Sequence, residues 1–276
     1  MSSHPLKVNH LVIVCGHGIW LGGAKKGWDE SEWLIESYKA GETPTFIEHI
    51  KAGIRVLTHD NRAVLVFSGG PTWKETKLSE ATSYYNLATA NEYFGLLPDS
   101  QELAEAGRIL VEERALDSYY NILFSLVLFW RTHAVWPEHV TIVSHAFKKA
   151  RLVDGHCAAI GFPLDRVDFI GINPPGIEET PAPDQGGNGG LALSEHAASV
   201  KAAVMTGVSQ TLDDWVKDPH GVGEVLAGKR RKRNPWSIDQ RLFVNDNERR
   251  QSGVQTRILD DGTEALADGK VQPWAQ

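Results

Sequence analysis

The stretch HLVIVCGHG at residues 10–18 indicates the fold more clearly than any other part of this chain. Its first six residues are a short run of mostly β-branched and apolar side chains, and Gly16, His17 and Gly18 follow directly. A continuous apolar run of this length is typical of a parallel strand that is covered on both faces. Glycines directly after a strand allow the backbone to turn tightly or to approach a ligand closely.

Three further runs repeat this pattern: AVLVF at residues 63–67, VTIV at 140–143 and RVDFIGI at 166–172. Between the apolar runs, helical patterns are expected at residues 31–39, 45–52, 79–94, 117–133 and 148–160. The alternation of strand and helix indicates right-handed crossovers. We therefore expect a Rossmann-like, doubly wound α/β fold with a mainly parallel sheet and helices on both faces. The helix at 117–133 is apolar nearly all round, which predicts a central, buried position.

The length of 276 residues favours one α/β domain over residues 1–276, with a core at about 10–172 and a C-terminal extension. Residues 174–190 are rich in proline and glycine and cannot continue a regular element. They are expected to form a long surface loop or lid, or a plain linker, and residues 191–205 a further helix.

Composition and charge exclude several classes of protein. The formal net charge of −7 offers no general attraction for a polyphosphate backbone, so no nucleic-acid partner is expected. The longest apolar run, at 122–130, is too short to span a membrane, and no secretory signal precedes the first strand. Two distant cysteines in apolar stretches favour buried, reduced thiols. These features predict a cytoplasmic location, with the nucleus as the alternative.

Four strand ends hold the candidate site residues, because ligands of open α/β sheets bind outside the carboxyl ends of the strands. At the first end, the N–H groups of Gly16 and Gly18 can approach an anion. His17 is a candidate ligand contact or general acid/base. The alternatives are an ordinary turn and a solvated histidine.

The second strand end contains Ser68, Gly69 and Gly70, and a helix follows after Ser79. A serine cap leaves free N–H groups at the helix start, which favours a bound anion. Glu80 at this helix start either points into the cleft as a base or ligand acceptor, or complements the helix dipole.

The third strand end contains Glu112, a second candidate base, with Asp117, Ser118 and Asn121 soon after. Asp117 and Asn121 are four residues apart, so a helix places both on one face. Asp117 is also a natural helix cap. Asn121 stands in an apolar helix and needs partners, so we expect Glu112 and Asn121 to be buried and hydrogen-bonded.

The fourth strand end contains Ser144, His145, Lys148 and Arg151. Arg151, one turn into the following helix, can bind a carboxylate or phosphate with two parallel hydrogen bonds. Simple surface exposure is the alternative for Lys148.

Taken together, the four segments resemble the DUF218 family, also called the YdcF-like family, over roughly residues 10–172. The family pattern combines a glycine loop after a strand, an SGG turn with a Ser-Glu-Ala helix start, a glutamate before a Thr/Asn-rich helix start, and a Thr-Ser-x-Phe-His-x-x-Arg-like strand end. The matching residues are Gly16 and Gly18; Ser68, Gly69, Gly70, Ser79, Glu80 and Ala81; Glu112, Asp117, Ser118 and Asn121; and Ser144, Phe147 and Arg151.

Two positions depart from that pattern. Lys148 stands where the family has histidine, and Asp117-Ser118 replaces the usual Asn-x-Thr start of the third segment. If the family histidine does acid/base work, Lys148 or His145 replaces it here, or the step is lost. The resemblance implies a Rossmann-like fold and a nucleotide-like ligand such as S-adenosylmethionine, or a role linked to the cell envelope.

These observations predict an enzyme, a hydrolase or transferase, that acts on a small phosphorylated or nucleotide-like molecule. The alternative is a non-catalytic module that binds a nucleotide or S-adenosylmethionine. A serine hydrolase is disfavoured, because no Gly-x-Ser-x-Gly elbow surrounds Ser68 or Ser144. No zinc-type spacing of cysteine and histidine appears, so no metal site is predicted. The basic run KRRKR at 229–233 is a solvated helix end, a nuclear localisation signal or a cap over an anionic ligand.

Overall fold

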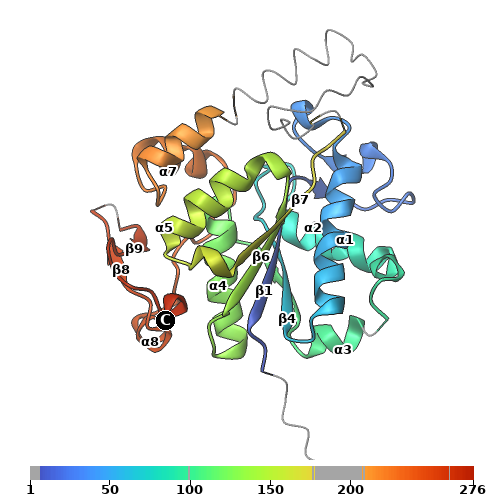
Figure 1. Cartoon of the computed structure of the whole chain (residues 1–276). Helices are drawn as coiled ribbons and strands as arrows, with labels where there is room; N and C mark the ends of the chain where they lie inside the picture. Colours follow the sequence, from blue (N-terminus) through green and yellow to red (C-terminus); the bar gives the residue numbers. More distant parts are fainter. Residues whose placement is uncertain (1–6, 99, 176, 178–206, 208, 261) are drawn as a thin grey trace, which may run out of the picture.

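The computed structural model describes residues 7–98, 100–175, 177, 207, 209–260 and 262–276, and its central sheet has five parallel strands in the order β5-β4-β1-β6-β7 (Figure 1). The strands are β1 (His10–Cys15), β4 (Ala63–Ser68), β5 (Ile109–Glu112), β6 (His139–Ser144) and β7 (Val167–Gly171). His10 pairs with Ala63 of β4 on one side and with His139 of β6 on the other. The α/β class and the parallel sheet are thus as predicted.

Helices cover both faces of the sheet (Figure 1). The covering elements are α1 (Thr43–His59) and α2 (Glu80–Ala90) on one face, and α4 (Ser118–His133), the π-helix η5 (Ala150–Cys157) and α5 (Ala158–Ile160) on the other. Neighbouring side chains of β1 point to opposite faces: Val12 packs in the same apolar cluster as α1, and Ile13 in the cluster of α4. Since both faces are buried, the strands are apolar throughout.

Helix α4 is the central buried helix that its sequence predicts, with ten buried residues. Cys15 of β1 and Cys157 of η5 belong to the same apolar cluster as α4, and both are buried and free, as expected. Helix α1 extends beyond the predicted 45–52 in both directions, and α2 ends at Ala90, four residues before the predicted end. A 3₁₀ turn, η3 (Glu92–Gly95), follows α2, and a short helix, α3 (Ser100–Glu105), precedes β5.

The helix predicted at residues 31–39 is wrong. Two 3₁₀ turns, η1 (Glu30–Glu32) and η2 (Ser37–Lys39), flank β3 (Trp33–Leu34), which pairs antiparallel with β2 (Ile19–Trp20). The Glu32 carboxylate accepts hydrogen bonds from the Trp20 indole and from the backbone N–H groups of Lys25 and Gly27. These longer-range bonds outweigh the local helical pattern.

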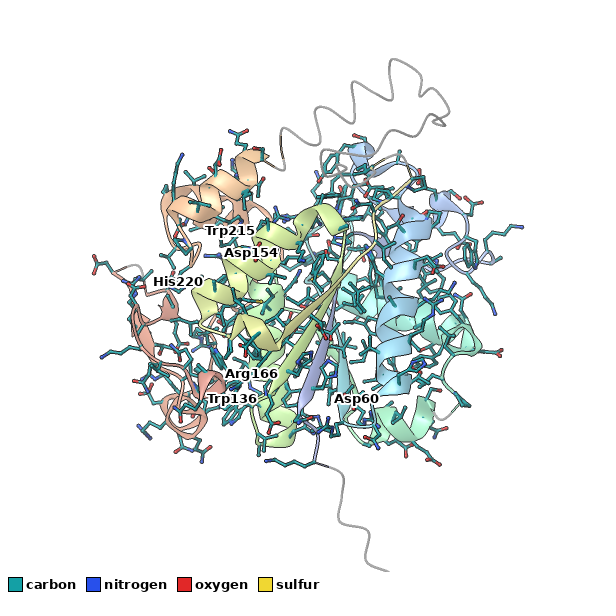
Figure 2. The ribbon with its side chains drawn as sticks, in the orientation of Figure 1. Asp60, Trp136, Asp154, Arg166, Trp215 and His220 are labelled. Carbon is teal, nitrogen blue, oxygen red and sulfur yellow. The ribbon has the colours of Figure 1, made fainter. Side chains whose placement is uncertain are left out.

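The C-terminal extension packs against α4 and η5. It contains α7 (Glu224–Lys232), α8 (Asp246–Ser252), the two-stranded sheet of β8 (Thr256–Ile258) and β9 (Glu264–Leu266), and a final 3₁₀ turn, η7 (Pro273–Ala275). Trp215 stacks on Tyr119 of α4 and belongs to the same apolar cluster, and Figure 2 shows it beside this helical layer. The predicted helix at 191–205 and most of the predicted loop at 174–190 lie outside the described residues.

Two short 3₁₀ turns complete the elements, η4 (Ala146–Lys148) after β6 and η6 (Leu164–Arg166) before β7. Residues 146–160 are therefore helical almost without interruption, as predicted for 148–160, although their hydrogen bonding changes from 3₁₀ to π to α. Among the described residues, no helix is both long and apolar enough to cross a lipid bilayer.

Candidate functional site

The candidate site lies where the strand order reverses. From β1 the chain adds β4 and β5 on one side and then returns to place β6 on the other side of β1. In this fold class ligands usually bind at the carboxyl end of such a strand pair, beside the loops that follow β1 and β6. Here the His17 ring, after β1, stacks on the His145 ring, after β6, with ring centroids 4.3 Å apart.

Gly16 makes room for Glu80. A Cβ atom at Gly16 would lie 2.6 Å from the Glu80 Cβ and 2.7 Å from Glu80 Oε2, too close for any side chain. The Gly16 N–H donates to the Ser68 carbonyl over 2.8 Å. Gly18 is packed in a similar way, since its Cβ would lie 2.6 Å from the Ile35 side chain.

The second glycine turn surrounds the same carboxylate. A Cβ at Gly69 would lie 2.7 Å from Glu80 Oε2, and the φ of Gly69 is +154°. The Gly69 N–H donates to the Glu112 carbonyl over 3.0 Å, and the Gly70 N–H to the Ala115 carbonyl over 2.6 Å. The N–H groups of these loop glycines are thus paired within the protein, and the glycines allow close packing around Glu80.

Glu80 is the first residue of α2, and Ser79 caps this helix by accepting from the Thr82 N–H over 2.9 Å. The Glu80 side chain is buried at the strand ends, as the functional interpretation requires, and the Thr72 hydroxyl approaches Glu80 Oε1 at 3.4 Å. Burial raises the pKa of Glu80, and the attraction of Lys39 does not cancel that effect.

Glu112 and Asn121 are both buried and hydrogen-bonded, as predicted. The Ser68 hydroxyl lies 3.0 Å from Glu112 Oε2 and 3.2 Å from Asn121 Oδ1. Backbone N–H groups of Arg114 and Ala115 donate to the two carboxylate oxygens over 2.8 and 3.2 Å. Burial raises the pKa of Glu112, and these N–H groups oppose the shift. Glu112 therefore fixes the loop that joins β5 to α4.

Asp117 and Ser118 begin α4 and are bonded to other parts of the protein. Asp117 caps the helix by accepting from two backbone N–H groups at 3.1 and 3.0 Å. Its second oxygen lies 2.9 Å from the Arg230 guanidinium in α7. The Ser118 hydroxyl lies 2.8 Å from His156 Nε2. The helix-cap interpretation of Asp117 is confirmed.

His17 is buried and links the loops after β1 and β6. Its Nε2 lies 3.2 Å from the Ser144 hydroxyl, and its Nδ1 lies 3.1 Å from Lys148 Nζ. Lys39 Nζ donates to the His17 carbonyl over 2.6 Å. Burial lowers the pKa of His17 well below its usual value, and the nearby Lys148 lowers it further. The solvated-loop alternative for His17 is wrong.

Lys148 and Arg151 place two cationic side chains at the start of the helical segment after β6. Lys148 is half-buried rather than exposed. Burial lowers its pKa well below the usual value, and repulsion from Arg151 adds to the shift. Arg151 Nε is buried and has no hydrogen-bond partner among the described residues. Among the described residues, neither Lys148 nor Arg151 forms an ion pair with a carboxylate.

His49 lies beside two of the predicted site residues and was not predicted from the sequence. It lies within α1 and is completely buried, and its ring centroid is 5.3 Å from that of His17 and 5.0 Å from that of His145. One ring nitrogen from each of the three histidines lies within 4.8 Å of the others, so the group could hold a metal ion. A single histidine in a helical pattern gives no signal of this kind, because its partners come from two distant loops.

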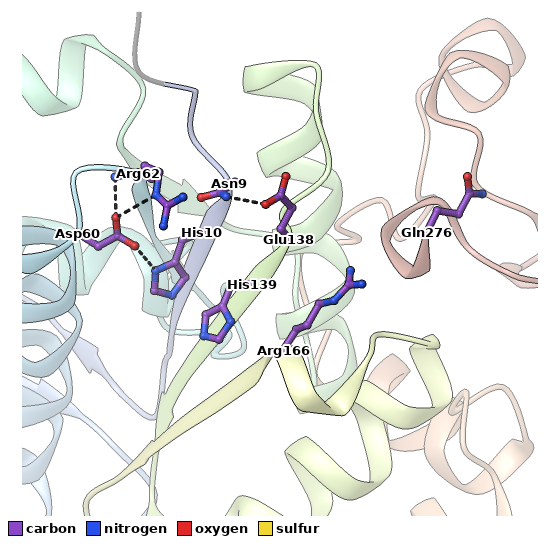
Figure 3. A pocket seen from close by; sticks show the side chains of 8 residues that line it. All are labelled: Asn9, His10, Asp60, Arg62, Glu138, His139, Arg166 and Gln276. Carbon is purple, nitrogen blue, oxygen red and sulfur yellow. Dashed lines mark hydrogen bonds and ion pairs between the residues drawn. The ribbon is translucent and has the colours of Figure 1, made fainter.

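A surface cavity of about 680 Å³ lies at the opposite, amino end of the sheet (Figure 3). His10, Asp60, His139 and Arg166 are among the residues that line it, and the sequence analysis selected none of them. The His10 ring is paired on both sides, with Asp60 at 2.8 Å and Thr141 at 2.8 Å. Figure 2 shows Asp60 and Arg166 at this end, away from the strand ends that hold the predicted site.

Comparisons with known proteins add one relative. No family model matches the sequence. An uncharacterized protein of Saccharomyces cerevisiae is 27% identical over 296 aligned residues, which cover 90% of this chain and 92% of the yeast protein. No solved structure matches. The similarity to the yeast protein spans nearly the whole of both chains and indicates no activity.

Proposed function

We propose that this chain is a DUF218-like enzyme, a hydrolase or group transferase, that acts on a phosphorylated or nucleotide-like molecule at the carboxyl ends of β1, β4 and β6. The observation that supports this proposal most is the pair Lys148 and Arg151. Both cations lie at the switch point, and within the described residues neither has a carboxylate partner.

The charge arrangement favours an anionic ligand. Burying cations near one another without counter-charges is unfavourable, and a bound anion removes that cost. Arg151 supplies planar donors that match a phosphate or carboxylate group. Arg233, from the basic run at 229–233, is close enough to lower the pKa of Arg151, and its own charge is partly balanced by Glu36 at 3.9 Å. The local positive charge at these strand ends then opposes the net charge of −7.

Glu80 is the better candidate for the general base. Both oxygens of Glu112 already accept hydrogen bonds from Ser68 and from backbone N–H groups, which leaves that carboxylate a structural task. Glu80 has one long hydrogen bond, to Thr72, and its raised pKa brings it nearer to the range in which a carboxylate accepts a proton effectively. In the proposed reaction Glu80 takes a proton from the attacking water or hydroxyl, and the cations stabilise the charge on the transferred group.

One observation favours the second candidate function, a binding module without chemistry. Lys148 stands where the DUF218 pattern has histidine, so a proton transfer by that residue in the family has no direct counterpart here. The His17 and His145 rings lie beside Lys148 and can replace it in acid/base work.

A thermal-melt panel of nucleotides, sugar phosphates and S-adenosylmethionine tests the ligand class. A ligand at 100 times its dissociation constant stabilises the fold by about 2.7 kcal/mol. Arg151→Gln should remove this shift, whereas Arg166→Gln, at the opposite end of the sheet, should retain it. If Arg166→Gln loses the shift and Arg151→Gln keeps it, the ligand binds in the amino-end cavity. If no anionic compound shifts the wild-type melt, the proposal fails.

Glu80→Gln separates the enzyme from the binding module. The substitution keeps the shape of the side chain and removes the base, so an enzyme should keep ligand binding and lose turnover by about 100-fold or more. Turnover is measured as release of phosphate or of the transferred group from each compound that shifts the melt. Wild-type protein that binds such a compound tightly and never converts it would favour the binding module.

A further inference from the structure

Three imidazole rings from three separate elements meet beneath the switch point. His17 follows β1, His49 lies in α1, and His145 follows β6. Their exposed fractions are 4%, 0% and 1%, so all three are inside the protein. Histidine is polar, and polar groups in such positions are normally satisfied by hydrogen bonds.

The hydrogen bonds leave several of these nitrogens without a partner. His49 Nε2 lies 2.9 Å from the Ile172 carbonyl, which can only accept, so Nε2 carries the proton and Nδ1 is left with a free lone pair. His49 Nδ1 and both ring nitrogens of His145 are buried and have no hydrogen-bond partner among the described residues. A ring that donates one N–H to a backbone carbonyl and directs its other nitrogen into a pocket has the usual orientation of a metal-bound histidine.

We propose that His17, His49 and His145 bind a divalent transition-metal ion such as Zn²⁺. Imidazole nitrogen suits zinc, copper, nickel and iron, and it disfavours Mg²⁺ and Ca²⁺, which prefer oxygen. Three histidines around Zn²⁺ leave a fourth position for water or a substrate oxygen. The proposal goes beyond the proposed function, because an ion could bind here whether or not the protein catalyses a reaction.

The distances are compatible with an ion after a small adjustment. The three ligand nitrogens lie within 4.8 Å of one another. A tetrahedral zinc site with Zn–N distances near 2.0 Å places its nitrogens about 3.3 Å apart. The rings therefore have to close by about 1.5 Å at most, which side-chain rotations in two loops can supply.

Charged neighbours set the conditions for binding. Lys148 Nζ lies 3.1 Å from His17 Nδ1, and a metal ion in the site would repel a charged ammonium group there. Glu42 offers compensation, since its Oε2 lies 3.5 Å from His145 Nε2. We expect the ion to displace Lys148 from His17. The lysine would then be free to face an anion on the strand-end side.

The test uses the full, untagged chain, dialysed against EDTA and then against buffered Zn²⁺, with bound metal measured by mass spectrometry. Wild-type protein should retain about one zinc ion per chain. His49→Gln should retain less than a tenth of that amount, because its amide can still donate to the Ile172 carbonyl but offers no imidazole. His10→Gln is the matched control, since His10 is also buried but has partners on both ring nitrogens, and it should retain the wild-type amount.

A spectroscopic measurement removes the dependence on the variant's folding. Wild-type protein titrated with Co²⁺ should develop the intense visible absorption of a tetrahedral site and saturate at one equivalent. Wild-type protein that retains no zinc and gives only the spectrum of hydrated Co²⁺ would overturn the proposal, as would folded His49→Gln that binds zinc like the wild type.

Arg151→Gln distinguishes this site from the proposed anion site. It should bind zinc normally whatever its effect on the nucleotide panel. Zinc binding by a protein that ignores every anionic ligand would support the metal site and reject the proposed function. Anion binding that is unchanged by EDTA in a protein without zinc would do the reverse.

Discussion

Replacing Arg230 with methionine tests whether a buried ion pair holds the C-terminal extension against the third strand end. Arg230 is 6% exposed and lies in the basic run at 229–233. Its guanidinium is 2.9 Å from Asp117 Oδ2, donates to the Gly221 carbonyl over 2.9 Å, and lies 4.6 Å from the centroid of the Tyr120 ring. Methionine keeps the apolar stem of the side chain and removes the charge and its donors.

The expected loss of stability is large for one surface-helix residue. Removing one partner of a buried pair typically costs about 3–5 kcal/mol, because the other charge is left without compensation. The Asp117 side chain is 14% exposed and still caps α4, so we take the lower end, about 3 kcal/mol. For a chain of this size, about 2–4 °C is lost per kcal/mol, which gives a decrease in Tm of about 6–12 °C.

Arg231→Met is the matched control, because it removes the same charge one residue away. The Arg231 side chain is 58% exposed, and its partner Glu224 is 87% exposed. Exposed pairs of this kind contribute less than about 1 kcal/mol, so the Tm of this variant should change little. Calorimetric melts of both variants, of Asp117→Asn, and of the Asp117→Asn/Arg230→Met double variant give the coupling energy between Asp117 and Arg230. Equal Tm values for the Arg230 and Arg231 variants, or strictly additive costs in the double variant, would refute the reasoning.

Two further predictions concern packing and pH. Gly53→Ala should cost about 1–3 kcal/mol in urea unfolding, because the new Cβ would lie 2.4 Å from the Val14 side chain, and Val14→Ala in the same chain should recover part of the loss. Glu112→Gln should lower the free energy of unfolding by about 1–3 kcal/mol, because the new amide NH₂ would face a backbone N–H group that now donates to a carboxylate oxygen. The pKa of Glu112 is raised in the folded state, so its contribution to stability is fully present below its unfolded pKa of about 4.5 and is lost as the pH rises through the folded pKa. The free-energy difference between wild type and Glu112→Gln should therefore be larger at pH 4 than at pH 7, and an opposite slope would show that the charged form is favoured.

The sheet could be predicted because its strands are buried on both faces. The predicted first strand agrees with β1 at both ends, since a run of five consecutive apolar residues after His10 is stable when it is covered on both faces of a sheet. The region at 31–39 failed for the opposite reason. There the structure depends on the Glu32 carboxylate binding a loop, and on the Trp33 indole donating to the Gly27 carbonyl over 2.8 Å. Local periodicity contains no information about such bonds.

The proximity of the strand-end residues to one another could also be predicted, but the contacts that each of them makes could not. The sequence does not distinguish a glycine whose N–H group binds an anionic ligand from a glycine that makes room for a neighbouring side chain such as Glu80. The contact between Gly16 and Glu80 depends on the distance between a loop and a helix start that are 64 residues apart in the sequence. His49 illustrates the same limit, because only the folded chain brings it to His17 and His145.

The arginines of the basic run at 229–233 make different contacts in the structure. Successive helical residues are rotated by about 100°, so neighbours in KRRKR cannot all face solvent. Arg230 points inward to Asp117, and Arg231 points outward to Glu224. Arg233, just past the end of α7, lies 3.9 Å from Glu36, near the second strand end. The solvated-helix interpretation is therefore correct for part of the run only.

The C-terminal extension is bonded to the loops of the candidate site at several places. The Trp236 indole donates to the carbonyls of Trp73 and Thr76 over 3.0 Å each, in the loop that precedes α2. The Gln240 amide donates to the Arg114 carbonyl over 2.9 Å, in the loop that follows Glu112. These bonds connect the extension to the loops that position the two candidate bases.

This arrangement bears on what the yeast relative shares with the chain. Residues 1–172 make up less than two thirds of the 276 residues, whereas the alignment covers 90% of the chain. Part of the extension therefore belongs to the shared sequence. In this part of the chain, Arg230 and Trp236 form polar bonds to the loops of the candidate site. The candidate site is thus bonded to two parts of the chain, and the strand-end motifs at 10–172 account for only one of them.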